Sequence, residues 1–371
     1  MRVMIRPLAS KPPADTVGQQ VPDVAATGSR FDAEALAGAH LTPAKIAVSL
    51  AVLLVLLFGG LLLAAACGSV HVNLYAAFSA PASADHAILF SVRLPRVLMG
   101  AVVGAVLATV GVALQALVRN PLAEGGILGI SGGGALGAIG AMILFYKSPF
   151  LAELVPLTAF TAALAATVVV YRLSQVHGVL EPFTLLLIGV ILNAFFGAAI
   201  MLVNSVVNFY YAHSILFWLM GSLAASSYRQ LLVVGAFGLA GFGVLMAAAR
   251  DLNLMSLGDE AAAELGVSVD RLRRTIFLAT SVMVGAAVSV SGIISFVGLL
   301  VPHVLRVVLG SDHRLLLPAS MIAGAAFMVV ADLVARVAIA PAELPVGAIT
   351  ALCGGPFFVY ALRHGGHGTA G

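Results

Sequence analysis

Charged residues, which are the ones most able to bind or react, are scarce in this chain and make up 9% of its 371 residues. Their densest group is SLGDEAAAELGVSVDRLRR, Ser256 to Arg274, where seven of nineteen side chains are charged. The letters DEAAAEL favour a helix with acids in its first turn, Gly266 favours a stop, and DRLRR opens a basic segment. We expect two short helices that project from the protein, with a plain solvated loop as the alternative.

Polar residues elsewhere do not form a catalytic set. The best candidates within apolar segments are Asn193, Asp332 and Glu343, which fall in different segments, whereas catalysis inside a membrane needs polar groups that converge. Asp332 and Arg336 are four residues apart, which predicts a local ion pair on one helix. The phosphate-binding pattern G-x-x-x-x-G-K-[ST] is absent, so this chain cannot by itself hydrolyse ATP by P-loop chemistry.

The composition indicates which elements must carry these residues. Hydrophobic residues make up 61% of the chain and its mean hydropathy is +1.08, whereas soluble domains are nearer to half apolar. The fold class predicted is an all-α polytopic membrane protein. A hydrocarbon core of ~30 Å needs ~20 apolar residues per helix. On that basis we expect ten spans, at roughly 46–66, 97–118, 127–145, 154–171, 183–203, 231–249, 275–290, 293–308, 315–334 and 344–362.

Three finer features follow from the same reading. The seventh and eighth spans are short and meet at Ser291-Gly292, which predicts a tight reversal or a broken helix inside the protein. The segment 214–225 is too short to cross and predicts a half-helix at one face. Gly100 and Gly104 stand in a small-xxx-small register that lets helix backbones pack closely. Residues 1–44 are expected to be a disordered cytoplasmic tail, 45–363 the transmembrane domain and 364–371 a C-terminal tail.

The basic residues predict the orientation. With both termini in the cytoplasm, 14 of the 19 Lys and Arg residues lie on that side, as the positive-inside bias requires. In this frame Ser256–Arg274 is cytoplasmic. Arg93, Arg96 and Arg336 fall on the outer side against the bias, which indicates either an acidic protein partner or anchoring to lipid phosphates.

Four blocks of sequence resemble one family. They are RLPRVLMGAVVGAVLATVGVALQALVRNPLAEGGILGISGG, SLGDEAAAELGV, SGIISFVGLLVPHVLRVVLGSDHRLLLPAS and ELPVGAITALCGGPFF. Together they make the chain, from about residue 46 to 363, similar to the FecCD family, the permease subunits of ABC importers for ferric siderophores, haem and cobalamin. The resemblance implies the permease fold of such importers, in which spans two to five and seven to ten form an inverted repeat. It leaves open which chelate is carried.

The resemblance also implies partners and a location. They are a second copy of this chain, two ATPase subunits that bind ATP and Mg, a periplasmic or extracellular substrate-binding protein, and the lipid of the inner membrane, with no nucleic acid. No cofactor, catalytic residue or metal is expected in this chain. His303 and His313 could bind iron, but they belong to motifs shared by carriers of different chelates, which favours structural or gating roles.

The resemblance gives three groups of residues a role. Arg93, Arg96 and Arg336 would dock the binding protein. Pro182 and Phe183 would lie at a cytoplasmic gate, although the family often has small hydroxyl residues there and ordinary packing is the alternative. The residues expected to couple to the ATPase are Leu257, Gly258, Asp259, Glu260, Ala263, Leu265, Gly266 and Val267.

Two other classes of protein are weighed against an importer permease. An ion-coupled secondary transporter would need ionisable residues at mid-membrane, and this sequence is poor in them. A membrane enzyme acting on lipids would need a catalytic cluster, which the sequence does not offer.

Overall fold

The protein is described by a computed structural model over residues 42–365, which are helical apart from connections and one strand pair, β1 (Gln175–Val176) with β2 (Val179–Leu180). Of the tails expected at 1–44 and 364–371, residues 1–41 and 366–371 lie outside the described residues, while residues 43–44 belong to the first helix and residues 364–365 to the last. The main helices are α2 (Pro43–Ala66), α5 (Leu94–Val118), α6 (Ile130–Leu144), α7 (Leu151–Leu173), α8 (Pro182–Val206), α10 (Tyr228–Ala247), α13 (Val269–Ser291), α14 (Val297–Leu309), α15 (His313–Val337) and α16 (Val346–Gly365). The short ones are α3 (Leu74–Ser79), α4 (Ala84–Ala87), a π-helical turn (Ile88–Arg93), α9 (Phe209–Leu219), α11 (Ala249–Met255) and α12 (Asp259–Glu264).

The ten predicted spans each coincide with a main helix. Among the described residues, seven helices are long and apolar enough to cross a membrane, and α6, α14 and the apolar part of α16 are shorter. The seventh span is longer than predicted, because α13 begins at Val269 within the charged segment and runs for 23 residues. The predicted half-helix is α9, which begins earlier than expected because the Asn208 side chain caps it.

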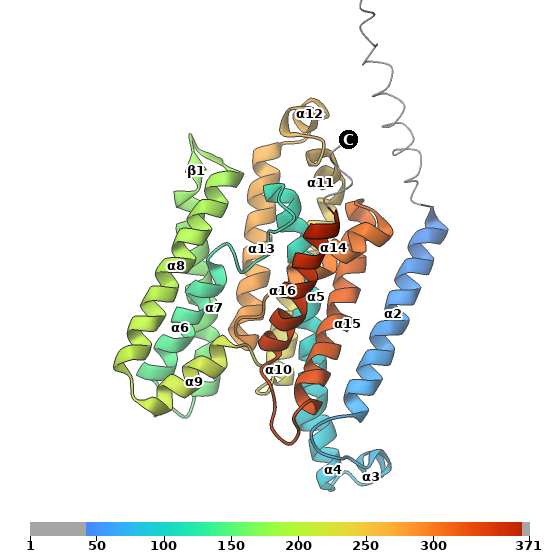
Figure 1. The fold of residues 1–371 in the computed structure, drawn as a ribbon, viewed down its shortest axis with the longest axis vertical. Helices are drawn as coiled ribbons and strands as arrows, with labels where there is room; N and C mark the ends of the chain where they lie inside the picture. The colour runs from blue at the N-terminus through green and yellow to red at the C-terminus, as the bar shows by residue number, and fades with distance from the viewer. Residues whose placement is uncertain (1–41, 366–371) are drawn as a thin grey trace, which may run out of the picture. The chain divides into compact units, whose positions relative to one another are not determined.

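The helices α5–α8 and α13–α16 repeat one pattern in opposite directions. Each group has a long helix, an irregular stretch and then a short helix preceded by a residue with positive φ, Gly129 (79°) before α6 and Phe296 (70°) before α14. In Figure 1, α5 starts near α4 at the lower end, whereas α13 starts near α12 at the upper end. This arrangement agrees with the predicted inverted repeat.

Close backbone contacts place α5 at the centre of the helices. A Cβ atom added to Gly104 would lie 2.2 Å from the carbonyl oxygen of Gly324 in α15, and one added to Gly111 would lie 1.8 Å from that of Gly298 in α14. Small residues allow this approach where lipid offers no hydrophobic drive for helix association. The packing role predicted for Gly104 is therefore confirmed.

The predicted break between the seventh and eighth spans is also confirmed. The helix α13 ends at Ser291, and Gly292 has a φ of 68° with its Cα so close to α9 that an added Cβ would lie 2.2 Å from the Trp218 carbonyl oxygen. Only glycine combines that conformation with that space. The chain then reaches α14 through four irregular residues.

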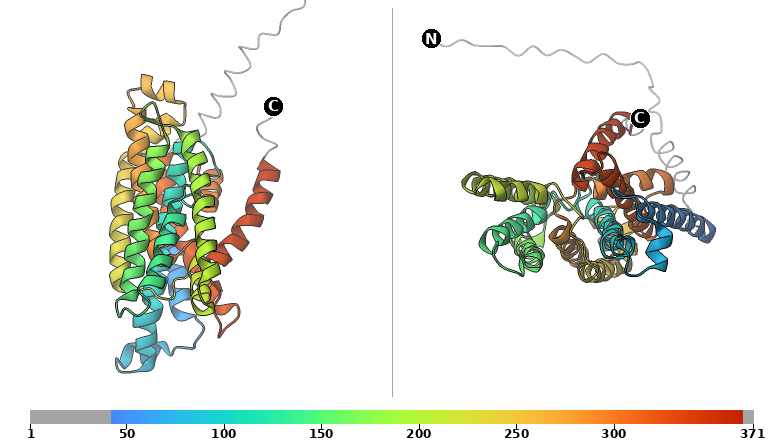
Figure 2. Two further views of the ribbon diagram at one scale, coloured as in Figure 1. Left: turned by 90° about the vertical axis from the view of Figure 1, so that its left-hand side faces the viewer. Right: turned by 90° about the horizontal axis from the view of Figure 1, so that it is seen from below.

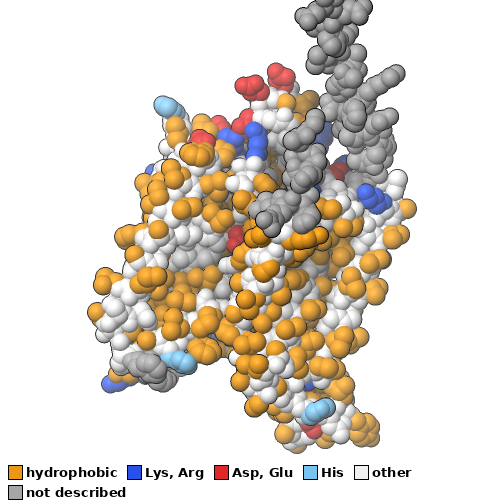
Figure 3. Space-filling view, viewed as in Figure 1, with side chains coloured by type: hydrophobic (Ala, Val, Ile, Leu, Met, Phe, Trp, Pro, Cys, Tyr) orange, Lys and Arg blue, Asp and Glu red, His pale blue; other side chains and the backbone are white. Residues whose placement is uncertain are grey.

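Surface character separates the ends of the molecule from its sides. The most apolar window of α5 is 83% buried within the chain, while that of α2 is 6% buried. Figure 3 shows apolar side chains over the sides and charged ones gathered at the end that carries α12. An apolar belt with a charged end is what a bilayer requires of a spanning protein.

We predict that Gly111→Ala destabilises the protein, because the new methyl group would overlap the α14 backbone and force α5 and α14 apart. Overpacking of this kind costs ~1–3 kcal/mol. Gly197→Ala in α8 is the matched control, since nothing lies within 4 Å of a Cβ there. Thermal unfolding in detergent checks the pair, and equal melting temperatures would contradict the close contact.

Candidate functional site

The helices α11 and α12, with the turn that leads into α13, form a compact knob at one end of the molecule (Figure 1). Its helix α12 lies between two glycines with positive φ, Gly258 at 125° and Gly266 at 88°. Ala262 and Val267 are buried and anchor it, with Val267 N donating to the Ala262 carbonyl. One short helix was predicted correctly, but the second, DRLRR, is instead the first turn of α13.

The outer surface of the knob offers apolar contacts. Leu257 and Leu265 are 66% and 59% exposed on either side of α12. Ala263, Gly266 and Glu260 are exposed with them. Two large apolar side chains beside an acidic one, on a helix that projects, are typical of a surface that fits a groove in a partner.

Asp259 does not belong to that outer surface. Its two carboxylate oxygens accept from Arg119, at the end of α5, and from Arg273 in α13. Arg119 also donates to the Met255 carbonyl at 3.2 Å. The two adjacent acids therefore have different roles. Glu260 faces solvent, whereas Asp259 ties the knob to two spanning helices.

A second tie joins the knob to α15 through the DHR letters. Asn253 of α11 donates to Asp312 at 2.8 Å and accepts from His313 N at 2.9 Å. His313 Nδ1 lies 2.7 Å from the same Asn253 amide oxygen, so that ring nitrogen must carry the proton. Hydrogen bonds from Arg314 and Asn253 lower the pKa of Asp312 to about 2, which keeps it charged at neutral pH.

The predicted gate residues lie near the knob. Glu181 caps α8 by accepting from the backbone N–H groups of Phe183 and Thr184, and Pro182 occupies the first turn, where no N–H is needed. The hydrogen bond with Thr184 lowers the pKa of Glu181. Phe183 is 72% exposed. A cavity of about 430 Å³ brings these residues together with Arg119, Asp259 and Arg273.

The three arginines predicted for the outer side are buried, whereas contact with a protein partner or with lipid phosphates would need them exposed. Arg93, Arg96 and Arg336 are all less than 8% exposed. Arg96 pairs with Asp332 at 2.9 Å and with Glu343 at 2.6 Å, and Arg336 pairs with the other oxygen of Asp332 at 2.9 Å. The predicted Asp332–Arg336 ion pair is thus present, as part of a larger cluster.

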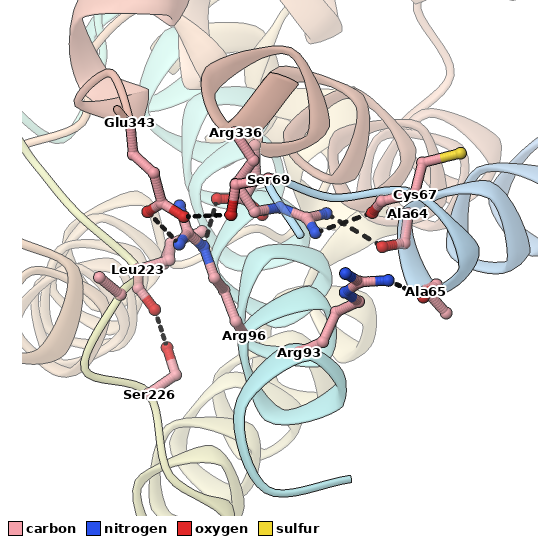
Figure 4. Close-up of polar contacts among 12 residues, drawn as sticks. Ala64, Ala65, Cys67, Ser69, Arg93, Arg96, Leu223, Ser226, Arg336 and Glu343 are labelled. Atoms are coloured by element: carbon pink, nitrogen blue, oxygen red, sulfur yellow. Dashed lines mark hydrogen bonds and ion pairs between the residues drawn. The ribbon is translucent and has the colours of Figure 1, made fainter. Parts of the chain in front are cut away.

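Two of these arginines, Arg93 and Arg336, hold the end of α2, as Figure 4 shows. Arg336 donates to the carbonyls of Ala64 and Cys67, each at 3.1 Å. Arg93 donates to those of Ala65, Ala66 and Val70. The last carbonyls of a helix lack internal partners and carry negative partial charge, so cations there are stabilising. The donors of Arg93 and Arg336 are thus used inside the chain, and a docking role for these arginines stays a prediction.

Sequence reasoning missed a polar group where irregular backbone meets α14. Glu124, between α5 and α6, accepts from Phe296 N at 2.8 Å. Gln115 donates to the Gly298 carbonyl at 3.1 Å and accepts from Arg306 at 2.9 Å. Such side chains satisfy peptide groups that a broken helix leaves free. The sequence offered one signal for this group, because Glu124 and Gln115 are isolated polar residues in apolar surroundings.

No metal centre emerges from the geometry of residues 42–365, where His, Cys, Asp and Glu do not gather in threes that could hold an ion. His303 lies near Phe358, with ring centroids 6.0 Å apart, rather than beside other ligands. Among the candidates considered for catalysis, Asp332 and Glu343 meet at Arg96, while Asn193 donates to the Gly126 carbonyl at 2.6 Å.

A fold of about ten apolar helices with broken elements, an inverted repeat and a projecting knob defines a multi-pass membrane permease. Comparison with known families is specific: residues 52–364 match the FecCD transport family, and the chain belongs to that family. It is the permease subunit of an ABC importer. This family assignment takes the place of the two alternatives, an ion-coupled transporter and a membrane enzyme acting on lipids.

Relatives with named cargoes support this assignment. The chain is 42% identical to the hemin transport system permease protein HmuU of Yersinia pestis over 279 residues, 74% of this chain and 83% of that one. It is 44% identical to the cobalamin import system permease protein BtuC of Halobacterium salinarum over 288 residues, 77% and 76% of the two chains. A solved inward-facing metal-chelate type ABC transporter matches with a TM-score of 0.75 and 32% identity, covering 86% of this chain and 99% of that one.

We predict that Asp332→Asn destabilises the protein strongly, because it removes the carboxylate that pairs with the buried Arg336 and leaves Arg96 with Glu343 as its remaining acidic partner. Breaking a buried ion pair in this way costs ~3–5 kcal/mol. The control is Glu153→Gln, which removes an exposed pair with Arg229 and should cost under ~1 kcal/mol. Chemical denaturation in detergent measures both, and a mild effect of Asp332→Asn would show that the cluster does not hold α2, α5 and α15 together.

Proposed function

We propose that this chain carries a metal chelate across the inner membrane as one of two permease copies, with an ATPase subunit beneath each copy and one binding protein above the pair. In this arrangement the knob and both termini face the cytoplasm. The cargo class follows from relatives whose names give hemin, cobalamin and Fe(3+) dicitrate. No described residue selects one chelate among these, so the cargo is proposed as a class.

One observation carries the proposal, namely a knob that is exposed on one side and tied to spanning helices on the other. Leu257 and Leu265 would enter a groove of the ATPase subunit, with Glu260 at the rim. ATP and Mg would be bound by that partner, in line with the missing phosphate-binding pattern in this chain.

The ties supply a route for movement. Asp259 connects the knob to α5 through Arg119 and to α13 through Arg273, and Asn253 connects it to α15. Displacement of the knob by the ATPase would therefore load three spanning helices together. Arg119 is also the first residue of the connection between α5 and α6. Glu124 in that connection accepts a hydrogen bond from Phe296 N, just before α14. Alternating access needs such a discrete linkage between a partner's motion and the helices that line a path.

Docking of a binding protein would take place at the opposite end, around α3, α4 and the start of α16. We propose that Arg93, Arg96 and Arg336 serve it indirectly, by fixing the end of α2 and the carboxylate of Glu343, which remains 34% exposed. Charge complementarity at such a surface would guide encounter more than it would add affinity.

Two variants separate the ATPase contact from the linkage. Leu265→Asp should preserve thermal stability, because the side chain is exposed, but weaken co-purification with the ATPase at least tenfold. Asp259→Asn should preserve co-purification, because both Asp259 oxygens are already paired with Arg119 and Arg273, but lower ATP-driven transport per ATP hydrolysed. Val176→Asp, exposed on β1 at the same end, is the control for a new surface charge.

Full ATPase binding by Leu265→Asp would remove the proposed contact surface. Undiminished transport per ATP in Asp259→Asn would show that the ion pairs with Arg119 and Arg273 do not transmit motion.

We also propose that Phe183 closes the cytoplasmic mouth, because its ring is exposed beside the cavity rather than packed in the core. Phe183→Ala should then raise ATP-independent leakage of a small dye from proteoliposomes, with a stability change within ~0.5 kcal/mol as for an exposed site. A variant that is destabilised but does not raise dye leakage would assign Phe183 to packing instead. Leu187→Ala, on the same helix and 48% exposed, is the control.

A further inference from the structure

A groove of about 730 Å³ opens between α7 and α10, with α13 as its floor. The two views of Figure 2 put α10 and α16 on opposite faces of the helices, so the groove lies away from the α16 side. Its floor includes Ala286, Ser289 and Val290. Ser289 already donates to the Ala286 carbonyl at 2.8 Å, so the floor presents little unmet polarity.

The dimensions of the groove match one leaflet of a bilayer. Its walls are Phe150–Phe160, leading into and along α7, and Ser227–Phe237 along α10. Ten residues of helix rise about 15 Å, which is half of a hydrocarbon core of ~30 Å. Both helices qualify as spans, so the groove opens into hydrocarbon, where an apolar chain rather than water must fill it.

The mouth of the groove carries one charge of each sign. Glu153, in the first turn of α7, lies 3.3 Å from Arg229, in the first turn of α10. Their side chains are 63% and 83% exposed, so both can rearrange to meet a ligand. A guanidinium binds phosphate well, and a carboxylate accepts hydrogen bonds from a primary ammonium group. This pair complements a headgroup that has both.

We propose that the groove is a binding site for a phosphatidylethanolamine-type lipid. One acyl chain lies between α7 and α10, the phosphate contacts Arg229 and the ammonium group contacts Glu153. A choline headgroup offers the carboxylate no N–H donor, and a glycerol headgroup offers it no cation, so the site selects the primary amine. The site is separate from the knob and the proposed importer function, and its test needs no transport.

The test is native mass spectrometry of the purified chain after equilibration with equal amounts of phosphatidylethanolamine, phosphatidylcholine and phosphatidylglycerol. The wild type should retain about one phosphatidylethanolamine per chain in preference to the others. Val233→Trp, which fills the groove at a position 51% exposed, should reduce that retention at least tenfold. Leu239→Trp, 67% exposed on α10 outside the groove lining, should behave as the wild type.

Glu153→Gln with Arg229→Gln should keep lipid binding but abolish the preference among headgroups. Thermal stability close to the wild type would show that each variant is folded. Equal retention of the three lipids by the wild type, or unchanged retention by Val233→Trp, would overturn the proposal. Disulfide cross-linking between two copies of Leu157→Cys, in a Cys67→Ser, Cys353→Ser background, would also overturn the proposal. It would show that a second copy of the chain, rather than a lipid, occupies the groove.

Discussion

The carboxylate of Asp332, shared by Arg96 and Arg336, is the interaction on which the half of the structure opposite the knob depends. It is 1% exposed, so the two guanidinium groups are balanced from within the protein, by Asp332 and, for Arg96, also by Glu343. Arg336, together with Arg93, reaches the free carbonyls at the end of α2, a helix otherwise largely exposed to lipid, and Arg96 holds Glu343 ahead of α16. One buried charge thus positions four helices, because hydrocarbon requires every polar group to find its partner within the protein.

The opposite end uses the same kinds of residues under different conditions. Asp259 and Asp312 pair with arginines that remain partly in water, as the exposed side chains of Arg119 and Arg314 show. Ion pairs in water contribute less and exchange more readily than buried ones. The end opposite the knob is therefore held more firmly than the knob end, which fits our proposal that the driving motion enters through the knob. The lipid-facing groove at α7 and α10 lies on the firmly held side.

Sequence patterns predicted the helices well because long apolar runs leave few alternatives in a membrane. The break at Gly292 and the close helix contact at Gly104 were also predicted from the sequence. Both depend on the missing Cβ of glycine, which allows positive φ and close backbone approach. The arginines show where such reasoning stops. The order of charges along the chain indicated the outer side for Arg93 and Arg96, but not that Arg96 would pair with Asp332, 236 residues away, or that Arg93 would donate to the carbonyls at the end of α2. Asp259 and Glu260 are adjacent and chemically alike, and only the fold separates the inward acid from the outward one.

The central claim, that this permease couples ATP use at its knob to movement of a metal chelate, is tested most directly by reconstitution. Proteoliposomes would contain the permease and its ATPase, with the binding protein and a radiolabelled chelate outside and ATP inside. The account predicts accumulation of haem, cobalamin or a ferric chelate that requires ATP, the ATPase and the binding protein together. Accumulation driven by an ion gradient in the absence of the ATPase would contradict it.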